Sequence, residues 1–308
     1  MGFLGRGRGP ALPHRGKAGR RVVVIQSDPH AGHRLGLCNP KTLVERVDDD
    51  GDWCEVPLLD LPGTGLTETQ ERLWRIHREH VDNAIQIADG CRLDVLQAGD
   101  STSGVKYPAG NMAVEPVDQI AIAAANLEPW RGYGRLGAMR FFSGTPAHSR
   151  LGLMTAEAIL AGKMRDAGID AKALHHARLT VEGKRFDVAH HGPPPGSRTW
   201  LEGNVARYYL RSAVWEDRAL GLEPADYYVR GHYHCWVEEE LTSLWHGERV
   251  ENHLLVIPSL SGMTDHARQF TRSKPVLING LVVFEIEDRR GTVTPMLDIQ
   301  DLRTEETL

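Results

Sequence analysis

Short apolar runs alternate with longer amphipathic stretches along this chain of 308 residues. The runs are rich in β-branched and other apolar residues and end in polar ones, which predicts strands buried on both faces at residues 21–26, 93–97 and 139–142. Apolar positions recur at helical spacing over residues 67–89, where Thr67 and Gln70 have the spacing of a capping box and Gly90 is a stop signal.

The remaining pattern extends the alternation of strands and helices. Helices are predicted at residues 112–126, 153–167 and 200–220, and a hairpin is predicted over residues 179–189. Further strands are expected at residues 226–230, 236–241, 253–257, 276–287 and 292–297. Strands alternating with helices predict an α/β fold class with a sheet covered by helices.

Composition excludes several classes of protein. Hydrophobic residues make up 41% of the chain and charged residues 25%, as in a globular domain. The most apolar stretches, residues 120–125 and 254–257, are far shorter than the roughly 18 to 20 residues that cross a membrane, so no membrane partner is expected. The four cysteines form no C-x-x-C pair, which favours a reducing, cytoplasmic location over a disulfide framework.

The first 21 residues differ from the rest. They contain six of the 36 basic residues, none of the 41 acidic ones and many glycines. Such a segment buries little apolar surface, so residues 1–21 are expected to form a flexible basic leader. Clustered cations also suit a nucleic-acid-binding arm, although the solvated leader is the more common case.

Polar side chains gather directly after five of the predicted strands. The carboxyl ends of strands in an α/β sheet meet along one edge, where ligands bind. Carboxylate, hydroxyl and imidazole groups together suit Mn²⁺, Fe, Zn²⁺ or Ni²⁺ rather than Ca²⁺. The candidate residues are Asp28, His30, Asp100, Thr145, His148, His190, His191, His232 and His234.

Spacing within these groups supports one common site. Residues two apart project to the same side of an extended chain, so Asp28 with His30, and His232 with His234, are each expected to face one cavity. Glycine precedes three of the candidates, at Gly99, Gly144 and Gly231, where it permits close backbone approach.

These groups, in this order, resemble the calcineurin-like metallophosphoesterase superfamily. The family pattern is D-x-H, G-D, G-N-H, H and G-H-x-H, and four of the five blocks are present over roughly residues 22–260. The resemblance implies a four-layer α/β/β/α sandwich of two mixed sheets, a single catalytic domain over residues 22–300 and a tail at 301–308. Residues 27–39 and 276–287 look most like the phage and prophage branch.

The resemblance also implies a dinuclear site. Asp28, His30, Asp100 and His234 would surround the first ion, and Asp100, Thr145, His190 and His232 would surround the second. Asp100 would then bridge two divalent ions, with Mn²⁺ favoured and Fe, Zn²⁺, Ni²⁺ or Mg²⁺ as alternatives. A hydroxide bridging the two ions would attack the phosphorus.

The third block departs from the pattern, because Gly144-Thr145-Pro146-Ala147-His148 replaces Gly-Asn-His. Thr145 offers a neutral hydroxyl, a poorer metal ligand than an amide oxygen, which weakens the second site. His148, the candidate catalytic histidine, comes two positions late, so the loop must bend to return its ring to the site.

Two neighbouring histidines compete for one ligand position. Side-chain alternation along the strand through Phe186 and Val188 favours His190 and turns His191 away. A one-residue slip would reverse this choice. Five further histidines, His77, His80, His175, His176 and His266, are expected to be surface or hydrogen-bonded residues.

The expected activity is metal-dependent hydrolysis of a phosphate ester, with a phosphodiester favoured and nucleic acid as a candidate substrate. A phosphomonoesterase and a non-catalytic metal-binding scaffold remain alternatives, whereas a metallo-β-lactamase-type hydrolase lacks its H-x-H-x-D-H cluster. Lys106, Arg131 and Arg150 are candidate phosphate clamps. The segment 112–130, between the second and third blocks, is expected to overhang the cleft.

Overall fold

The computed structural model describes residues 19–194, 203–264 and 276–306. Most of the basic leader, the start of the predicted helix at 200–202 and His266 therefore lie outside the described residues. The first strand begins at Arg20, so the last two residues assigned to the leader belong to a sheet. None of the helices in the described part of the chain is long and apolar enough to cross a membrane.

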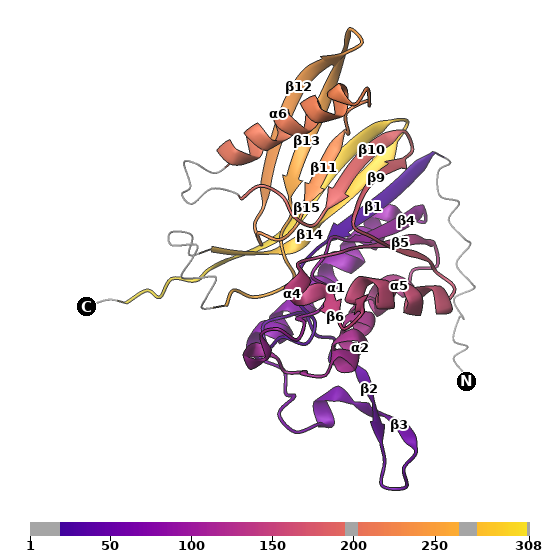
Figure 1. Cartoon of the computed structure of the whole chain (residues 1–308), viewed down its shortest axis with the longest axis vertical. Helices are drawn as coiled ribbons and strands as arrows, with labels where there is room; N and C mark the ends of the chain where they lie inside the picture. Colours follow the sequence, from indigo (N-terminus) through magenta and orange to yellow (C-terminus); the bar gives the residue numbers. More distant parts are fainter. Residues whose placement is uncertain (1–18, 195–202, 265–275, 307–308) are drawn as a thin grey trace, which may run out of the picture.

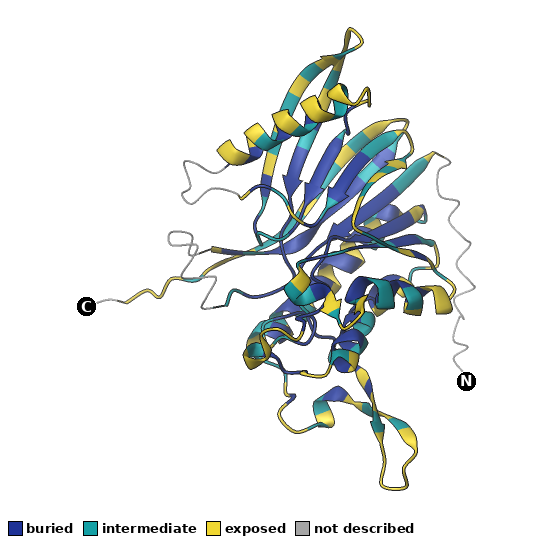
Figure 2. Cartoon of the chain, viewed as in Figure 1, coloured by how far each residue is buried: buried dark blue, intermediate teal, exposed yellow. Residues whose placement is uncertain are grey.

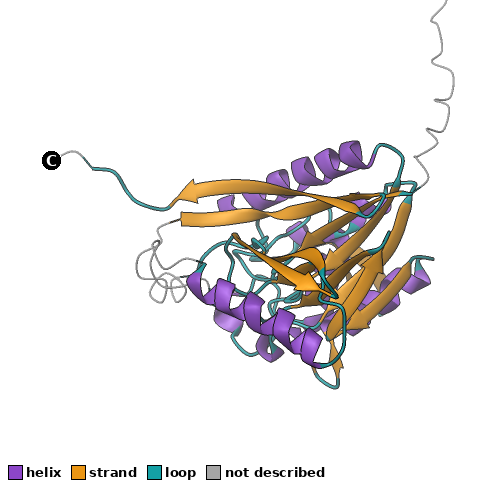
Figure 3. Cartoon of the chain, turned by 90° about the horizontal axis from the view of Figure 1, so that it is seen from above, coloured by secondary structure: helices purple, strands orange, loops and turns teal. Residues whose placement is uncertain are grey.

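Two mixed β-sheets pack against each other in the middle of the molecule (Figures 1 and 3). The six-stranded sheet has the order β15-β14-β1-β4-β5-β8, in which β1, β4, β5 and β8 are parallel. Its strands are β1 (Arg20–Gln26), β4 (Arg92–Gln97), β5 (Leu136–Phe142), β8 (Asp170–Leu174), β14 (Val276–Glu287) and β15 (Arg290–Asp301).

The second sheet has five strands in the order β12-β13-β11-β10-β9, with β10, β11 and β13 parallel. They are β9 (His176–Val181), β10 (Lys184–Ala189), β11 (Tyr227–Arg230), β12 (Val237–Trp245) and β13 (Glu248–Val256). Two small two-stranded sheets pair β2 (Leu43–Val47) with β3 (Trp53–Pro57), and β6 (Arg150–Leu151) with β7 (Met154–Thr155).

Helices cover the outer face of each sheet. α1 (Glu68–Ala88) and α5 (Ala156–Asp166) pack on the six-stranded sheet, and α6 (Asn204–Ala219) packs on the five-stranded sheet. The other helices are η1 (Leu58–Asp60), η2 (Pro108–Gly110), α2 (Pro116–Asn126), α3 (Glu128–Arg131) and α4 (Pro146–Ser149). This arrangement confirms the predicted α/β class and its helix–sheet–sheet–helix layering.

Strand β1 explains why the apolar runs are continuous. Its even positions, Val22 and Val24, contribute to the core beneath the helices, whereas Val23 and Ile25 contribute to the core between the sheets. A strand that is covered on both faces has apolar side chains on both faces. Its sequence is therefore a continuous apolar run, whereas a half-exposed strand alternates apolar and polar residues. In Figure 2 the central strands of both sheets are largely buried, whereas the edge strands β9, β12 and β15 are mostly intermediate or exposed, as is the outer face of α6.

The start of α1 follows its sequence signals. Thr67 Oγ1 accepts a hydrogen bond from the Gln70 amide at 3.2 Å, and Gln70 Oε1 accepts one from the Thr67 amide at 3.0 Å. At the other end, Asp89 already adopts the left-handed conformation, one residue before the predicted stop at Gly90. The capping box is therefore confirmed.

One region adds a hairpin that the sequence pattern did not predict, and another differs from the expectation. The stretch before α1 contains the β2–β3 hairpin, which projects from the body (Figure 1) and is held where Arg46 pairs with Asp118 of α2 at 2.7 Å. The segment 112–130 does not overhang a cleft. Its helices α2 and α3 contribute Ile122 and Trp130 to the core, because their apolar positions fill the space beside the six-stranded sheet.

One histidine of α1 is completely buried in this core. His77 Nε2 lies 3.3 Å from Gln26 Oε1, an oxygen that also accepts a hydrogen bond from Trp130 Nε1 at 3.2 Å. The Nδ1 atom of His77 is buried without a hydrogen-bond partner. Burial therefore lowers the pKa of His77 from 6.5 to about 3.

His77 should make the protein sensitive to acid. The folded state keeps this imidazole neutral, whereas the unfolded chain takes up a proton near pH 6.5, so stability is complete above that pH and decreases below it. Between pH 7 and pH 5, the variant His77→Gln should lose about 2 kcal/mol less unfolding free energy than the wild type. Urea denaturation of the metal-free protein at both pH values measures this difference. The exposed-site variant His246→Gln should behave as wild type, and equal losses in His77→Gln and the wild type would contradict the assignment.

Candidate metal centre

The predicted site residues converge at the carboxyl ends of five parallel strands. The loops after β1, β4, β5, β10 and β11 bring all eight together around one cavity of about 890 Å³ or directly beneath it. Potential ligand atoms from these loops form several groups in which all atoms lie within 4.8 Å of one another. The residues are Asp28, His30, Asp100, Thr145, His148, His190, His232 and His234.

One half of the site surrounds the Asp28 carboxylate. Its Oδ1 atom lies 3.3 Å from His234 Nε2, 3.8 Å from His30 Nε2 and 3.9 Å from His190 Nε2. The His30 and His234 Nε2 atoms are themselves 3.4 Å apart. Three imidazole nitrogens therefore face one carboxylate oxygen, as the donor atoms of a metal site do.

Asp100 lies between this half and a second one. Its Oδ2 atom is 4.0 Å from His30 Nε2 and 3.3 Å from His190 Nε2. In the second half, Thr145 Oγ1 lies 3.5 Å from His190 Nε2 and 3.3 Å from His232 Nδ1. The carboxylate thus has the position expected of a group shared between two ion sites.

The backbone at the site is strained in the same way five times. Asp28, His30, Asp100, His232 and His234 all have positive φ angles, between 43° and 74°. Side chains other than glycine avoid this region, and each such residue costs on the order of 1–3 kcal/mol. Strain concentrated on the candidate ligands indicates that the fold maintains their directions against a local cost.

Close backbone approach explains the glycines beside the ligands. A Cβ atom on Gly99 would lie 2.3 Å from His190 Nδ1, and one on Gly144 would lie 2.0 Å from Asp100 Oδ1. Any larger residue at either position would push a candidate ligand out of place.

Neighbouring groups orient each carboxylate. Asp28 Oδ2 accepts hydrogen bonds from Ser27 Oγ at 2.5 Å and from the His232 amide at 3.0 Å, while Oδ1 is buried without a hydrogen-bond partner. The Thr145 amide donates to Asp100 Oδ1 at 2.6 Å, which leaves Oδ2 toward His190. Buried polar atoms are normally hydrogen-bonded, so an orphaned carboxylate oxygen facing three imidazoles fits a divalent cation.

The histidines differ in protonation. Burial lowers the pKa of His30 to about 3, and burial together with nearby His190 lowers the pKa of His232 to about 4. Burial also disfavours charge on His190, but the carboxylates of Asp28 and Asp100 outweigh it and raise its pKa to about 9. The pKa of Asp28 lies below its usual value despite burial, because His190 and His234 face it. A bound cation would replace the proton on His190.

The second ring nitrogen of His190 has a partner of its own. Its Nδ1–H donates to the Ala98 carbonyl at 2.7 Å, which directs Nε2 toward the carboxylates. This arrangement, an imidazole oriented by a backbone carbonyl, is common for metal ligands. His190 is also fully buried, as its place at the end of β10 predicts.

His148 returns to the site despite its displacement in sequence. The turn of helix α4 brings its ring to 4.5 Å from that of His30, centroid to centroid. An α-helix rises only 1.5 Å per residue along its axis. The two extra residues before His148 therefore move its ring only a short distance from the position in the family pattern. Its Nδ1–H donates to the Ser103 carbonyl at 2.7 Å. The other ring nitrogen is Nε2.

His191 does not turn away from the site. Although exposed, its ring centroid lies 4.8 Å from that of His232 and 4.9 Å from that of His190, and its nitrogen joins theirs in one group. Alternation holds only within β10, which ends at Ala189. Beyond it the chain passes so close to Arg230 that a Cβ on Gly192 would lie 2.5 Å from Arg230 Cγ.

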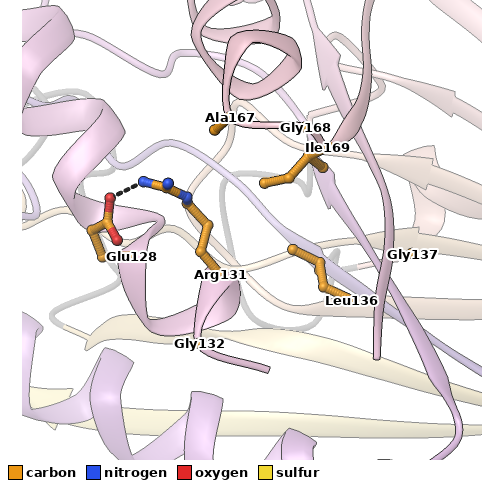
Figure 4. A pocket seen from close by; sticks show the side chains of 8 residues that line it. All are labelled: Glu128, Arg131, Gly132, Leu136, Gly137, Ala167, Gly168 and Ile169. Carbon is orange, nitrogen blue, oxygen red and sulfur yellow. Dashed lines mark hydrogen bonds and ion pairs between the residues drawn. The ribbon is translucent and has the colours of Figure 1, made fainter. Parts of the chain in front are cut away.

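The candidate phosphate clamps separate into two groups. Lys106 lines the 890 Å³ cavity. Arg131 instead pairs with Glu128 beside a different pocket of about 410 Å³, lined also by Leu136 and Ile169 (Figure 4). Arg150 is exposed and is not among the described lining residues of the site cavity.

A buried acid below the site gave no signal in the sequence. Glu157, in the first turn of α5, accepts hydrogen bonds from Ser149 Oγ at 3.2 Å and from the Ser101 amide at 3.4 Å. Burial raises the pKa of Glu157 to about 7. It connects the loop after Asp100 to helix α4, but one glutamate on an amphipathic helix looks like any other surface acid until the fold buries it.

Comparisons with known proteins give little further information. The sequence matches no protein-family model and no curated protein. It is similar to the structure of an archaeal phosphodiesterase, with 12% identity, a TM-score of 0.39 and coverage of 89% of this chain and 99% of that one. The solution structure of a Thermotoga maritima protein shows 15% identity, a TM-score of 0.25 and coverage of 51% and 78%. At such scores, only the chain's own side chains bear on its function.

Divalent cations should stabilise the folded protein through Asp28. With Mn²⁺ at about 100 times its dissociation constant, the free energy of unfolding should rise by about 2.7 kcal/mol. Asp28→Asn removes the charge that faces three imidazoles, so at least half of this gain should disappear. Thermal unfolding with and without Mn²⁺ measures the gain, and Asp301→Asn, at the end of β15, serves as the control. A full gain in Asp28→Asn would show that the ion binds elsewhere.

Thr145→Asn should strengthen the second half of the site. An amide oxygen is a better donor to a divalent ion than a neutral hydroxyl, and we expect affinity for the weaker of two Mn²⁺ ions to increase about tenfold. Calorimetric titration with Mn²⁺ resolves the two ions. The affinity for the stronger ion should not change. In the control variant Thr304→Asn, the affinities for both ions should match those of the wild type. Unchanged or weaker binding of the second ion would mean that position 145 does not contribute a ligand.

Proposed function

We propose that this protein is a metal-dependent phosphoesterase that hydrolyses a phosphodiester. The observation that carries the proposal is the position of Asp100, whose Oδ2 atom lies 4.0 Å from His30 Nε2 and 3.3 Å from His190 Nε2. The order of the motifs, which resembles the metallophosphoesterase superfamily, supports the same reaction. The phage and prophage branch remains a prediction from sequence.

Two divalent ions would be held by the two halves of the site. Asp28, His30 and His234 would hold the first, His190, His232 and Thr145 would hold the second, and Asp100 would contact both. When bound, such ions act as Lewis acids that polarise the phosphoryl oxygens and activate water. Mn²⁺ suits this mixed set of oxygen and nitrogen donors, as do Fe, Zn²⁺ and Ni²⁺.

His148 would provide the proton for the departing alcohol. Its Nδ1–H is held by the Ser103 carbonyl, so a second proton, carried on Nε2 in the imidazolium form, is the one that would pass to the leaving oxygen and return the ring to its neutral form. The backbone carbonyl holds the ring in one orientation, as general acid catalysis requires. The same ring lies 4.5 Å from that of His30, centroid to centroid, so the proton donor is adjacent to a candidate metal ligand.

Charge in the cavity favours a diester over a monoester. Among the described residues that line it, Lys106 is the only lysine or arginine. A phosphomonoester carries nearly two negative charges at neutral pH, with a second pKa near 6, whereas a diester carries one. A cavity with a single lysine besides its ion sites matches the lower charge. Nucleic acid therefore remains a candidate substrate.

The proposal predicts Mn²⁺-dependent release of nitrophenol from bis-p-nitrophenyl phosphate. Asp100→Asn should reduce kcat by about 10³-fold because it weakens both ion sites, and His148→Ala should reduce it by about 10²-fold or more. His246→Ala, on the distant β12–β13 turn, should retain the wild-type rate.

Two outcomes would contradict the proposal. Equal rates in Asp100→Asn and wild type would place the hydrolysis at another site or in a contaminant. No turnover in wild type with two bound ions per chain, counted by elemental analysis, would instead support a metal-binding scaffold without catalysis.

A further inference from the structure

The loop between β4 and α2 forms one wall of the site cavity. Ser103, Lys106, Tyr107, Ala109 and Gly110 from this loop line the cavity together with the candidate ligands. Helix η2 (Pro108–Gly110) gives its second half a regular structure. The wall therefore comes from the part of this loop that follows Asp100, residues 103–110, which provides no candidate metal ligand.

Buried amides fix the base of this wall. The Gly104 amide donates to Gln119 Oε1 at 2.8 Å, and the Gly104 carbonyl accepts from Asn111 Nδ2 at 2.9 Å and from Gln119 Nε2 at 3.1 Å. Ser103 Oγ donates to Asn111 Oδ1 at 2.6 Å. Both amide side chains are buried, so the loop starts and ends at fixed points and its exposed tip is held in place.

The tip presents an aromatic ring to the cavity. Tyr107 is 60% exposed and lies in an exposed stretch, residues 105–109. Lys106 Nζ lies 5.3 Å from the centroid of the Tyr107 ring. Apart from histidines, Tyr107 is the only aromatic residue among the described residues that line this cavity. A ring face and a positive charge are thus adjacent on the same wall.

The wall is connected to the reacting centre. The Ser103 carbonyl that starts the loop accepts the hydrogen bond from His148 Nδ1, and the His148 ring lies beside His30. A cavity of about 890 Å³ is also much larger than a phosphate group and has the size of a small-molecule site. There is space for one arm of an ester between the candidate ligands and Tyr107.

We propose that Tyr107 and Lys106 form a subsite for a planar aromatic or heteroaromatic ring, such as a nucleobase, on the non-leaving arm of a phosphodiester. The ring stacks on Tyr107, and the Lys106 ammonium group lies near the negative charge of the same substrate. Stacking of a base on an aromatic side chain accepts any planar ring, so the subsite selects a chemical class rather than one base. This inference rests on the proposed phosphodiesterase activity.

Two esters with the same leaving group test the subsite. The p-nitrophenyl ester of thymidine 5′-monophosphate has a ring on its second arm, whereas methyl p-nitrophenyl phosphate has none, and both release nitrophenol. In Tyr107→Ala, the ratio of kcat/KM for the thymidine ester to that for the methyl ester should fall about tenfold, mainly through KM. Tyr107→Phe keeps the ring and should keep the ratio. Tyr208→Ala removes an exposed tyrosine from α6 and is the matched control.

Binding provides a readout that does not depend on turnover. Calorimetric titration of the Mn²⁺-loaded protein with thymidine 5′-monophosphate should give about tenfold weaker binding in Tyr107→Ala than in wild type or Tyr107→Phe. If Tyr107→Ala leaves both the ester ratio and this affinity unchanged, the subsite is wrong. If the wild type cleaves neither ester but binds the nucleotide through Tyr107, the subsite stands and the proposed hydrolysis fails.

Discussion

A buried carboxylate oxygen without a hydrogen-bond partner determines the organisation of this protein. Asp28 is completely buried, and its Oδ1 atom faces the imidazoles of His30, His190 and His234. An isolated buried charge would be very costly, so the chain must bring a positive group to it. A proton on His190 meets this need in the protein alone, and divalent cations would meet it when bound.

The rest of the fold holds that arrangement in place. Five strand ends from two sheets contribute to it, and five of the candidate residues adopt strained left-handed conformations there. Behind the site, Gln26 Nε2 donates to Gln97 Oε1 at 2.9 Å, and Gln97 Nε2 donates to the Gly99 carbonyl at 3.1 Å. This buried chain begins beside His77 and ends one residue before Asp100, so core packing and ligand position are connected.

The cavity combines a reacting centre with a wall of different chemistry. Carboxylates and imidazoles from the strand ends form the centre, whereas Lys106 and Tyr107 stand on a loop anchored by Asn111 and Gln119. The two parts meet where His148 donates to the Ser103 carbonyl. A change in the loop tip can therefore alter which ester fits without moving the ligands.

The sequence by itself determined which side chains reach the sheet edge. Continuous apolar runs identify the central strands, and polar residues directly after them must emerge at the carboxyl end, because strand geometry is local. This reasoning predicted the α/β class, the helix α1 with its capping box, and the eight candidate residues that the structure brings together. The two-sheet arrangement was implied by the resemblance to the metallophosphoesterase superfamily.

Only the tertiary structure decided how the chain turns beyond each strand. The helical turn at α4 returns His148 to the site, and beyond the end of β10 the ring of His191 lies 4.8 Å from that of His232. The segment 112–130 fills the core, which leaves the shorter loop with Tyr107 to line the cavity, and burial makes Glu157 part of the support. Each outcome depends on contacts between residues distant in the chain, which no local pattern of hydrophobic and polar positions records.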